Sequence, residues 1–382
     1  MEVSPGDGFE ELQMTRATIE SLAVLAIVAT LLAPAKAQGQ TTDTRTPAAR
    51  TRAEVEALIK EVGSKSPEWW NSVTPRHPET LDLNWPLKPV GKWDANRNMG
   101  QFIWDIINPN PNRWKEGVKL VHQLMIRHKN DPAKLTRSMN TLGRMFHDLL
   151  EDWARAAFWW RMSARRGGQY NALGLAHCYW KLGNKEMAVE ILSQYRGDYT
   201  RHGAVIKFWA EMGEFEKAIR LAEQKARSGM ADVGYLTAGD ACRLAGKYDK
   251  ALSYYEKAAA ARDSNGREGD FKRNIERARA SIQAIKCFDA LDLSRIPDGT
   301  YQAGSTAYAG ELYVAVTVRS ERIESIRITK HKERQFYSAF TDTPNQILAK
   351  QSVKGVDAVT GATMTSEAII NATAKALAGA IK

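Results

Sequence analysis

Cysteine is scarce in this sequence, which has three cysteines among 382 residues. Cys178, Cys242 and Cys287 make no Cys-x-x-Cys-His motif and no cluster with iron–sulfur spacing, so attached c-type haem and an iron–sulfur centre are excluded. An odd number of cysteines cannot pair fully within one chain. Because Cys178 and Cys242 fall within helical patterns, we expect them to be small buried residues. The seven histidines are dispersed, with no metal-ligand spacing.

Charge tracts of one sign are also missing. The composition, 43% hydrophobic and 26% charged residues, is typical of a soluble protein with two or three domains. The formal net charge is +10, but Lys and Arg are scattered among acidic residues, and no nucleic-acid module is present. The sequence therefore predicts no nucleic-acid partner. The excess positive charge favours an anionic membrane surface or an acidic protein partner.

The N-terminus carries a targeting signal. Leu22 to Ala33 is an apolar run too short to span a bilayer comfortably, and the small residues Ala35 and Ala37 follow at signal-peptidase spacing. The preceding flank is acidic, and a start at Met14 would leave a flank of conventional length. The pattern predicts a signal peptide over residues 1–37 and a mature protein that is periplasmic or membrane-associated on the outer side of the inner membrane. An uncleaved anchor is the alternative.

Two segments precede the main helical pattern. Residues 38–50, rich in Thr, Gln, Pro and Ala, are predicted to be a flexible linker, and residues 51–116 form a Trp/Pro-rich N-terminal region. Thr51 and Glu54 have the spacing of a capping box, and a short amphipathic helix then stops at Gly63. Beyond it, abundant Trp and Pro predict an irregular but ordered segment whose indole rings pack on the helices downstream. A surface that stacks carbohydrate or quinone rings is the alternative.

Residues 117–290 have a helical pattern with an internal repeat. Copies of a turn followed by a helix recur at Leu150–Ala156, Leu182–Ala188, Met212–Ala218 and Ala245–Ala251. The closing alanines of successive copies lie 30 to 33 residues apart. This repeat resembles the tetratricopeptide repeat, in which a glycine and an aromatic residue form the turn and a small residue sits where paired helices cross. Lys185 departs from the pattern, because an aromatic residue is expected there.

The resemblance implies an all-α, tetratricopeptide-like solenoid of stacked helix pairs with a concave face. Such a face often holds a peptide or protein, so docking of a partner is one expected role. A spacer that only positions the next domain is the other, and the fold alone does not decide between them. A final capping helix is expected over Phe271–Ile285.

The hydrophobic period changes to two near the start of a last domain, residues 296–382. Strands are predicted over Thr300–Ala309, Leu312–Val318 and Ile323–Thr329. Thr343 and Pro344 have the pattern of a helix start, with Thr343 as N-cap, and Val353 and Val356 that of a short extended segment. Strands followed by helices predict a small α+β domain with an antiparallel sheet.

One stretch near the C-terminus combines hydroxyl groups with a glycine at the start of a helical pattern. It reads Asp357-Ala358-Val359-Thr360-Gly361-Ala362-Thr363-Met364-Thr365-Ser366. Such a junction suits an anion, because unpaired N–H groups and the positive end of the helix dipole point at the same spot. Gly361 lets a bulky group approach the backbone, and Thr363 offers a hydroxyl at the mouth of the turn. A plain helix cap, with Thr365 or Ser366 as N-cap, is the alternative.

The order of these residues resembles the Asp-x-x-Ser/Thr-Gly-Ala-Thr attachment motif of FMN-binding domains. Examples occur in the C subunit of sodium-translocating NADH:quinone reductase and the G subunit of the Rnf complex. In that family a separate ApbE-type transferase esterifies the last threonine to the phosphate of FMN. The resemblance implies phosphothreonyl-FMN at Thr363, with the remaining site residues Asp357, Thr360, Gly361, Ala362, Thr365 and Ser366. Since like charges repel, Asp357 would hold the turn or be recognised by the transferase rather than bind the phosphate.

Contacts to the flavin ring are expected from residues near this turn: Tyr308, Phe336, Tyr337, Phe340 and Met364. Simple core packing is the alternative for each of them. Four basic residues follow the third predicted strand: Lys330, His331, Lys332 and Arg334. Their positive charge would favour the anionic reduced flavin, and the alternative is that they belong to a solvated loop.

The sequence as a whole thus predicts an exported electron-transfer flavoprotein whose helical repeats dock a redox partner, a membrane-bound partner included. No Gly-x-Gly-x-x-Gly unit, nicotinamide site or substrate base is found, which favours an electron carrier over a complete enzyme. One alternative is a tetratricopeptide adaptor or scaffold whose C-terminal domain binds flavin non-covalently or not at all. A reductase with its own organic substrate is another.

Overall fold

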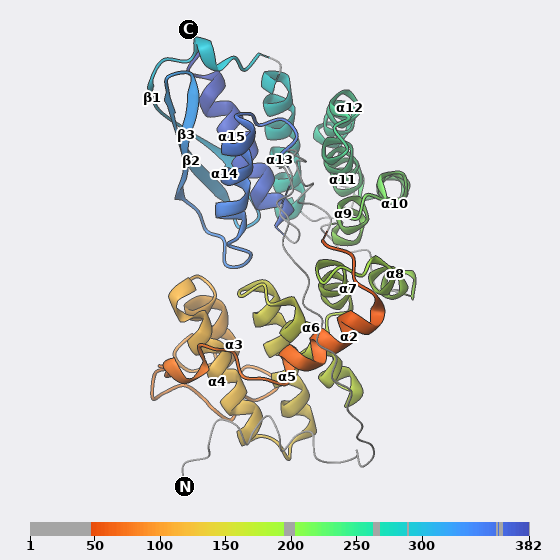
Figure 1. Ribbon diagram of the computed structural model, residues 1–382, viewed down its shortest axis with the longest axis vertical. Coiled ribbons are helices and arrows are strands. Elements are labelled where there is room, and N and C mark those ends of the chain that lie inside the picture. Colours follow the sequence, from red (N-terminus) through yellow and green to blue (C-terminus); the bar gives the residue numbers. More distant parts are fainter. Residues whose placement is uncertain are drawn as a thin grey trace, which may run out of the picture.

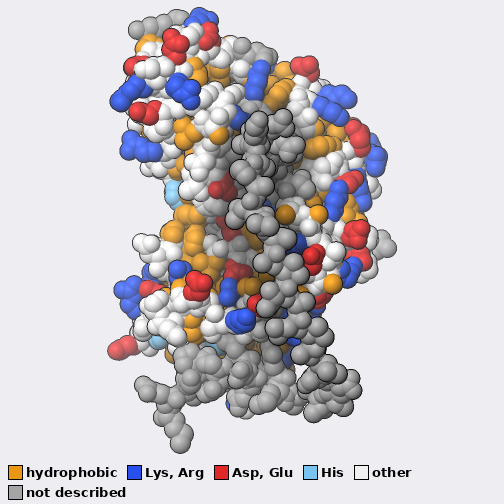
Figure 2. All heavy atoms as spheres, viewed as in Figure 1, with side chains coloured by type: hydrophobic (Ala, Val, Ile, Leu, Met, Phe, Trp, Pro, Cys, Tyr) orange, Lys and Arg blue, Asp and Glu red, His pale blue; other side chains and the backbone are white. Residues whose placement is uncertain are grey.

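The structure is a computed structural model that describes residues 47–194, 203–262, 268–288, 290–356, 358 and 362–381. The predicted signal peptide lies outside these residues. Figure 1 shows helical pairs along one side of the molecule and a smaller domain, with three strands and covering helices, at the C-terminal end. On the face shown in Figure 2, Lys and Arg side chains alternate with Asp and Glu side chains, in agreement with the scattered charge of the sequence.

The N-terminal region is made of short helical pieces joined by irregular chain. Its elements are α2 (Arg52–Gly63), η1 (Trp70–Ser72), α3 (Met99–Phe102), η2 (Ile103–Ile107) and η3 (Pro111–Arg113). Thr51 and Glu54 form the expected capping box at the start of α2. Trp70 and Trp85 are buried in the core of the helical region, whereas Trp93 is largely exposed. Tryptophan therefore serves mainly to attach this irregular segment to the helices that follow.

The predicted linker ends earlier than expected. Residues 47–50 lie against the repeat region: the Arg50 N–H donates to the Gly183 carbonyl (3.0 Å), and Asn184 Nδ2 donates to the Arg50 carbonyl (3.0 Å). The prediction of a flexible linker up to residue 50 is therefore wrong for its last residues, because backbone hydrogen bonds to a turn fix them. Residues 38–46 lie outside the described part of the chain.

The middle of the chain is a series of helix pairs. It comprises α4 (Trp114–Arg127), α5 (Pro132–Asp148), α6 (Trp153–Arg165), α7 (Ala172–Lys181), α8 (Lys185–Gln194), α9 (Ala204–Glu211), α10 (Phe215–Arg227), α11 (Ala231–Leu244), α12 (Tyr248–Ala259) and α13 (Glu268–Phe288). The four closing alanines of the repeat are completely buried: Ala156, Ala188, Ala218 and Ala251. This burial agrees with the requirement for a small residue where paired helices cross. Cys178 and Cys242 are buried as expected.

The turns inside the helix pairs need a left-handed backbone. Gly183, Gly213 and Gly246 have φ of +94°, +81° and +71°, which glycine adopts without a steric penalty. Glu151 occupies the same place in the first copy, with φ of +51°. Lys185, where the repeat expects an aromatic residue, instead reaches the next turn and pairs with Glu214 at 2.6 Å.

The C-terminal domain is a three-stranded antiparallel sheet with helices on one face. Strands β1 (Gly299–Thr306), β2 (Glu311–Arg319) and β3 (Arg322–Lys330) lie in the order β1-β2-β3, and η4 (Leu293–Arg295), α14 (Ala339–Lys350) and α15 (Thr363–Ala378) complete the domain. Every second residue of β2 is buried, from Leu312 to Val318, and α15 covers this side of the sheet. The predicted fold class, an all-α tetratricopeptide-like solenoid followed by a small α+β domain, is confirmed.

Two local predictions in this domain are wrong. Helix α14 begins at Ala339 and contains Pro344, whereas the sequence pattern placed its start at Thr343. The earlier start follows from the preceding loop, because Phe340 N–H already donates to the Tyr337 carbonyl (2.9 Å) in a tight turn. Val353 lies in a bend after α14, not in an extended segment, and it is buried against the sheet.

Among the described residues, two of the interfaces between the C-terminal domain and the rest of the chain lie near the start of α15 and beside the loop before α14. In the helix interface, α15 meets α9, α11 and α13 through Lys207, Glu211, Asp240, Arg243, Arg277, Thr363, Glu367 and Asn371. In the loop interface, residues 331–338 between β3 and α14 meet the N-terminal region and the α5–α6 turn through Trp104, Asp105, Pro109, Asp148 and Glu151. Helices α9 and α11, the first members of their pairs, therefore face the chain's own last domain.

Candidate functional site

Thr363 is the first residue of α15 and lies where the C-terminal domain meets the repeat region. Its N-cap is Ala362, which offers no side-chain cap, so the first N–H groups of the helix have no partner from that residue. The Thr363 side chain is half-buried, and its Oγ1 donates to Glu211 Oε1 of α9 at 3.0 Å. The alternative with Thr365 or Ser366 as N-cap is wrong, because both residues lie inside the helix and are buried.

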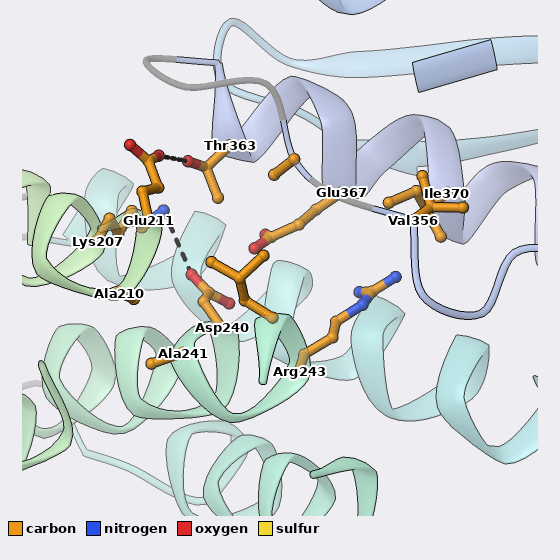
Figure 3. Close-up of a pocket in the computed structure, with 12 residues that line it drawn as sticks. Lys207, Ala210, Glu211, Asp240, Ala241, Arg243, Val356, Thr363, Glu367 and Ile370 are labelled. Atoms are coloured by element: carbon orange, nitrogen blue, oxygen red, sulfur yellow. Dashed lines mark hydrogen bonds and ion pairs between the residues drawn. The ribbon is translucent and has the colours of Figure 1, made fainter. Parts of the chain in front are cut away.

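Two cavities meet at Thr363. The outer cleft has a volume of about 650 Å³, solvent at its mouth included, and is lined by Ala204, Lys207, Tyr308, Glu333, Gln335, Phe336, Ala362, Thr363, Met364 and Thr365. The inner cavity lies between α9, α11 and α15 and is drawn in Figure 3; its volume is about 440 Å³ with the adjoining open solvent included. Residues from both halves of the molecule line each cavity, and Lys207 and Thr363 line both.

The outer cleft brings together three of the five residues expected to contact a flavin ring. Tyr308, Phe336 and Met364 line it. Tyr337 and Phe340 do not line it: their rings pack on each other at 5.1 Å, and Tyr337 also packs on Trp114. Tyr337 is directed at the N-terminal region, whereas Phe340, the second residue of α14, packs against the core of its own domain. Neither position agrees with the predicted ring contact.

Phe336 is held in place by the repeat region. Its φ is +52°, an uncommon backbone conformation for an aromatic residue. The Phe336 N–H donates to the Asp148 carbonyl at 2.8 Å, and its ring meets the His147 ring edge-on at 5.5 Å. Such a conformation persists where surrounding contacts over-determine it, so this wall of the cleft depends on α5 as well as on its own domain.

The basic loop residues are not the source of positive charge in the cleft. Arg334 pairs with Asp105 Oδ1 at 2.6 Å, and Lys330 Nζ lies over the Tyr313 ring. None of the four residues of this group lines the cleft, and their predicted effect on the reduced flavin stays a prediction. The cation that lines the cleft is Lys207, which comes from α9. Sequence reasoning missed Lys207, since nothing in its own neighbourhood marks it as different from other repeat lysines.

A buried charge cluster fixes α15 against the repeats. Arg277 of α13 bonds Glu367 Oε2 at 2.7 Å and lies 3.5 Å from Asp240 Oδ2 of α11. Lys207 Nζ lies 3.3 Å from the same Asp240 oxygen, as Figure 3 shows. One turn beyond Glu367, Asn371 accepts from Arg243 at 2.9 Å. The face of α15 that begins with Thr363 is thus bound to three helices of the repeat region.

The two carboxylates of this cluster respond differently to their surroundings. Burial raises the pKa of Asp240, but Lys207 and Arg277 outweigh it and bring that pKa below its usual value. Burial, followed by the charge of Asp240, raises the pKa of Glu367 despite its short contact with Arg277. The shifts are opposite because Asp240 has two cations close by, whereas Glu367 shares one of them with a competing carboxylate.

Glu333 supplies a second titratable group at the outer cleft. It is buried, and one oxygen accepts from the Ala309 N–H at 3.1 Å. Burial raises the pKa of Glu333, and hydrogen bonds from the Ala309 backbone and the Thr365 hydroxyl only partly offset this. The raised pKa widens the pH range over which this carboxyl group is protonated and can donate a hydrogen bond.

Three predicted site residues, Asp357, Thr360 and Gly361, lie outside the described residues. The described residues contain no group of three or more His, Cys, Asp or Glu side chains that could hold a metal ion. Likewise, none of the helices in the described ranges is long and apolar enough to cross a membrane.

Comparison with known proteins agrees with this architecture. Residues 307–378 match the family model of the FMN-binding domain, and residues 172–195 and 238–268 match tetratricopeptide-repeat models. The C-terminal part is therefore an FMN-binding domain, preceded by tetratricopeptide repeats, as predicted. The chain is a flavin-binding protein with a repeat region.

One relative is a protein of Treponema pallidum (strain Nichols) described as an uncharacterized protein. It is 35% identical over 97 residues, which are 25% of this chain and 26% of that protein. The chain thus matches about a quarter of that relative's length. No solved structure matches the chain.

The residues at the outer cleft fit FMN. The aromatic rings of Phe336 and Tyr308 and the side chain of Met364 line it, a lining typical of sites for flat organic molecules. A helix N-terminus and the amine of Lys207 suit a phosphate group. Lys207 Nζ is buried and, among the described residues, is paired with Asp240 alone, so further N–H donors are available to an anion bound there.

Proposed function

We propose that this chain is an exported electron-transfer flavoprotein that carries FMN through a phosphoester to Thr363. The observation that carries the proposal is the position of the Thr363 hydroxyl. It stands at the first residue of a helix, half-buried, between an aromatic-lined cleft and a buried cation, in a domain that matches the FMN-binding family. The Asp357–Thr363 motif and the predicted signal peptide support attachment and export, respectively.

The attachment step requires a donor and a separate enzyme. We expect an ApbE-type transferase to use a flavin dinucleotide, in which FMN is joined to a nucleoside monophosphate by a phosphoanhydride bond. The Thr363 Oγ attacks the phosphorus of the FMN half, an Oγ–P bond forms, and the anhydride bond breaks with release of the nucleoside monophosphate. The hydroxyl proton passes to a base of the transferase, and no electrons are transferred.

The chain's own residues would bind and orient the cofactor. Phe336, Met364 and Tyr308 line the cleft in which the ring would lie, and Glu333 would offer it a carboxyl group for a hydrogen bond. The helix N-terminus at Thr363 favours the phosphodiester charge by about 0.3–1 kcal/mol. When bound, FMN accepts and passes on one or two electrons, which none of the side chains supplies.

The repeat region has two proposed roles. Through α9 and α11 it positions the FMN-binding domain. Docking of a redox partner, a membrane-bound one included, would then use helices that face away from this domain, such as α8 and α10. An exposed, acidic partner surface would suit the net charge of +10.

The decisive experiment is expression in an exporting host together with an ApbE-type transferase. We expect denatured full-length protein to fluoresce as a flavin band in a gel, and intact mass to show one added FMN. Thr363→Val should remove both signals, whereas Thr363→Ser should retain them. Thr341→Val, which removes an exposed hydroxyl of α14 away from the cleft, is the matched control and should stay fluorescent.

A dark wild-type band would contradict covalent attachment and favour the adaptor, with flavin bound non-covalently or not at all. A fluorescent band in Thr363→Val would place the bond on another residue. For export, the fluorescent species should be found in the periplasmic or membrane fraction. Its recovery from the cytoplasm alone would contradict that part of the proposal.

A further inference from the structure

We propose that the repeat region completes the flavin site, with Lys207 of α9 binding the phosphate of the FMN held at Thr363. The inference rests on the proposed attachment at Thr363 and goes beyond it, because it assigns half of the phosphate site to another part of the chain. The FMN-binding domain alone would then hold the cofactor incompletely.

The first argument is the state of the Lys207 amine. Lys207 is 8% exposed, and among the described residues its Nζ forms one ion pair, with the Asp240 oxygen at 3.3 Å. A buried ammonium group has three N–H donors and is costly to leave unsatisfied. Lys207 also lines both cavities that meet at Thr363. Because one carboxylate oxygen does not occupy all three donors, an oxyanion attached to Thr363 would have further N–H groups of Lys207 beside it.

The second argument is the balance of buried charge. Among the described residues of the helix interface, the buried charged side chains include three cations, Lys207, Arg243 and Arg277. They also include two carboxylates, Asp240 and Glu367, and burial raises the pKa of Glu367. Counted over these five buried side chains, there is at least one positive charge in excess; Glu211, the nearby half-buried carboxylate, lies outside this count. A phosphodiester, which keeps one negative charge, would neutralise that excess.

The third argument concerns Glu211, on the same helix one turn after Lys207. In the unmodified chain its carboxylate accepts the Thr363 hydroxyl proton in a hydrogen bond of 3.0 Å. Esterification removes that proton and places an anion where the donor was. Glu211 is only half-buried, so it can turn toward solvent. Attachment of FMN therefore exchanges a Thr363–Glu211 contact for a phosphate–Lys207 contact across the same interface.

This exchange predicts that flavinylation changes the strength of the helix interface in a way that depends on these two residues. Removing the Lys207 charge should make the attached phosphate destabilising. Removing the Glu211 charge should make it more stabilising. The two substitutions act with opposite signs, which a general loss of stability would not produce.

The test compares thermal unfolding of flavinylated and unmodified full-length protein for each variant. The readout is the difference in Tm between the two forms, so an equal loss of stability in both cancels. We expect Lys207→Met to lower this difference by about 2–4 °C relative to wild type. Glu211→Gln should raise it, and Lys207→Arg should restore most of the wild-type value. Lys185→Met, which removes a repeat lysine paired with Glu214, is the control and should leave the difference unchanged.

Phosphorus NMR of the flavinylated protein gives a second readout. The phosphodiester resonance should shift in Lys207→Met and stay in place in Lys185→Met. Unchanged Tm differences together with an unchanged resonance in Lys207→Met would overturn the inference while leaving covalent attachment intact. Absence of bound flavin in the wild-type protein, seen by intact mass, would instead overturn the proposed function on which the inference rests.

Discussion

The helix interface and the loop interface hold the same domain by different means. The helix interface buries charged side chains: Arg277 and Asp240 are almost inaccessible, and Glu367 bonds Arg277 at 2.7 Å. The loop interface uses backbone groups and rings instead, such as the Phe336 N–H on the Asp148 carbonyl. Its main ion pair, Arg334 with Asp105, is about one-third exposed.

This difference suggests a division of tasks. A buried charge pair contributes little net stability but tolerates no misplacement, because a lone buried charge is heavily penalised. The helix interface therefore fixes where Thr363 lies relative to α9. Backbone hydrogen bonds and aromatic contacts hold the shape of a loop, and here they hold Phe336 in its unusual conformation. The first interface positions the attachment site, and the second shapes the wall of the cleft.

The largest effect is expected from breaking the helix interface. Arg277→Met should lower the free energy of unfolding by about 3–5 kcal/mol, because it leaves two buried carboxylates with one cation fewer. Chemical denaturation of the unmodified protein measures this. The double variant Arg277→Met/Glu367→Gln removes one of those carboxylates as well and should recover part of the loss. A single variant with wild-type stability would show that this cluster is hydrated rather than buried.

An intermediate effect is expected when the pH is lowered, through two histidines packed behind the loop interface. His177 bonds His147 at 2.8 Å, and His147 packs on Phe336. Burial, followed by the charge of His147, keeps the pKa of His177 well below its ordinary 6.5. The unfolded chain therefore takes up a proton as pH falls through 6.5, while the folded chain does not. Stability should fall by about 1.4 kcal/mol between pH 7.5 and 5.5 from this residue alone.

The comparison of pH dependence isolates His177. His177→Gln should flatten the decline in unfolding free energy between pH 7.5 and 5.5, whereas His77→Gln, at an exposed histidine, should leave it unchanged. The helix interface should not respond in this range through Asp240, whose depressed pKa confines its loss of stability to pH values below about 3.8. An equally steep decline in His177→Gln would contradict the assignment.

The smallest effect is expected at the exposed part of the loop interface. Arg334→Ala should cost about 0.2–1 kcal/mol, since the Arg334–Asp105 pair is partly solvated and salt-screened. Arg319→Ala, which removes a more exposed pair with Glu324, is the control and should change stability even less. A loss above 2 kcal/mol in Arg334→Ala would mean that the two interfaces are not as different as described.

Much of the fold followed from local patterns. The alternation in β2 and the spacing of the closing alanines are short-range signals, and the structure buries these residues as expected, with Leu312 and Ala251 fully buried. The start of α14 could not be derived in this way. Thr343 and Pro344 have a good local helix-start pattern, but the loop before them is fixed by distant partners and begins the helix earlier.

Some residues of the candidate site could likewise be predicted from local sequence, and others could not. Thr363 was identifiable because its neighbours along the chain carry the motif. Lys207 and Glu211 were not, because their relation to Thr363 exists only after α9 and α15 come together. Tyr337 and Phe340 were predicted to contact the flavin because they are close to the motif in sequence. In the structure Tyr337 packs on Trp114, and Phe340 packs on Tyr337, outside the cleft.

The sequence by itself determined the order of the parts, the repeat, the strand pattern and the threonine that the attachment motif places before the last helix. These depend on residues close together in the chain, where spacing alone decides which face a side chain takes. Only the tertiary structure decided which charges surround that threonine and which aromatic residues reach the cleft. Buried charges and loop conformations are set by partners far away in sequence, since their energies depend on what excludes water around them.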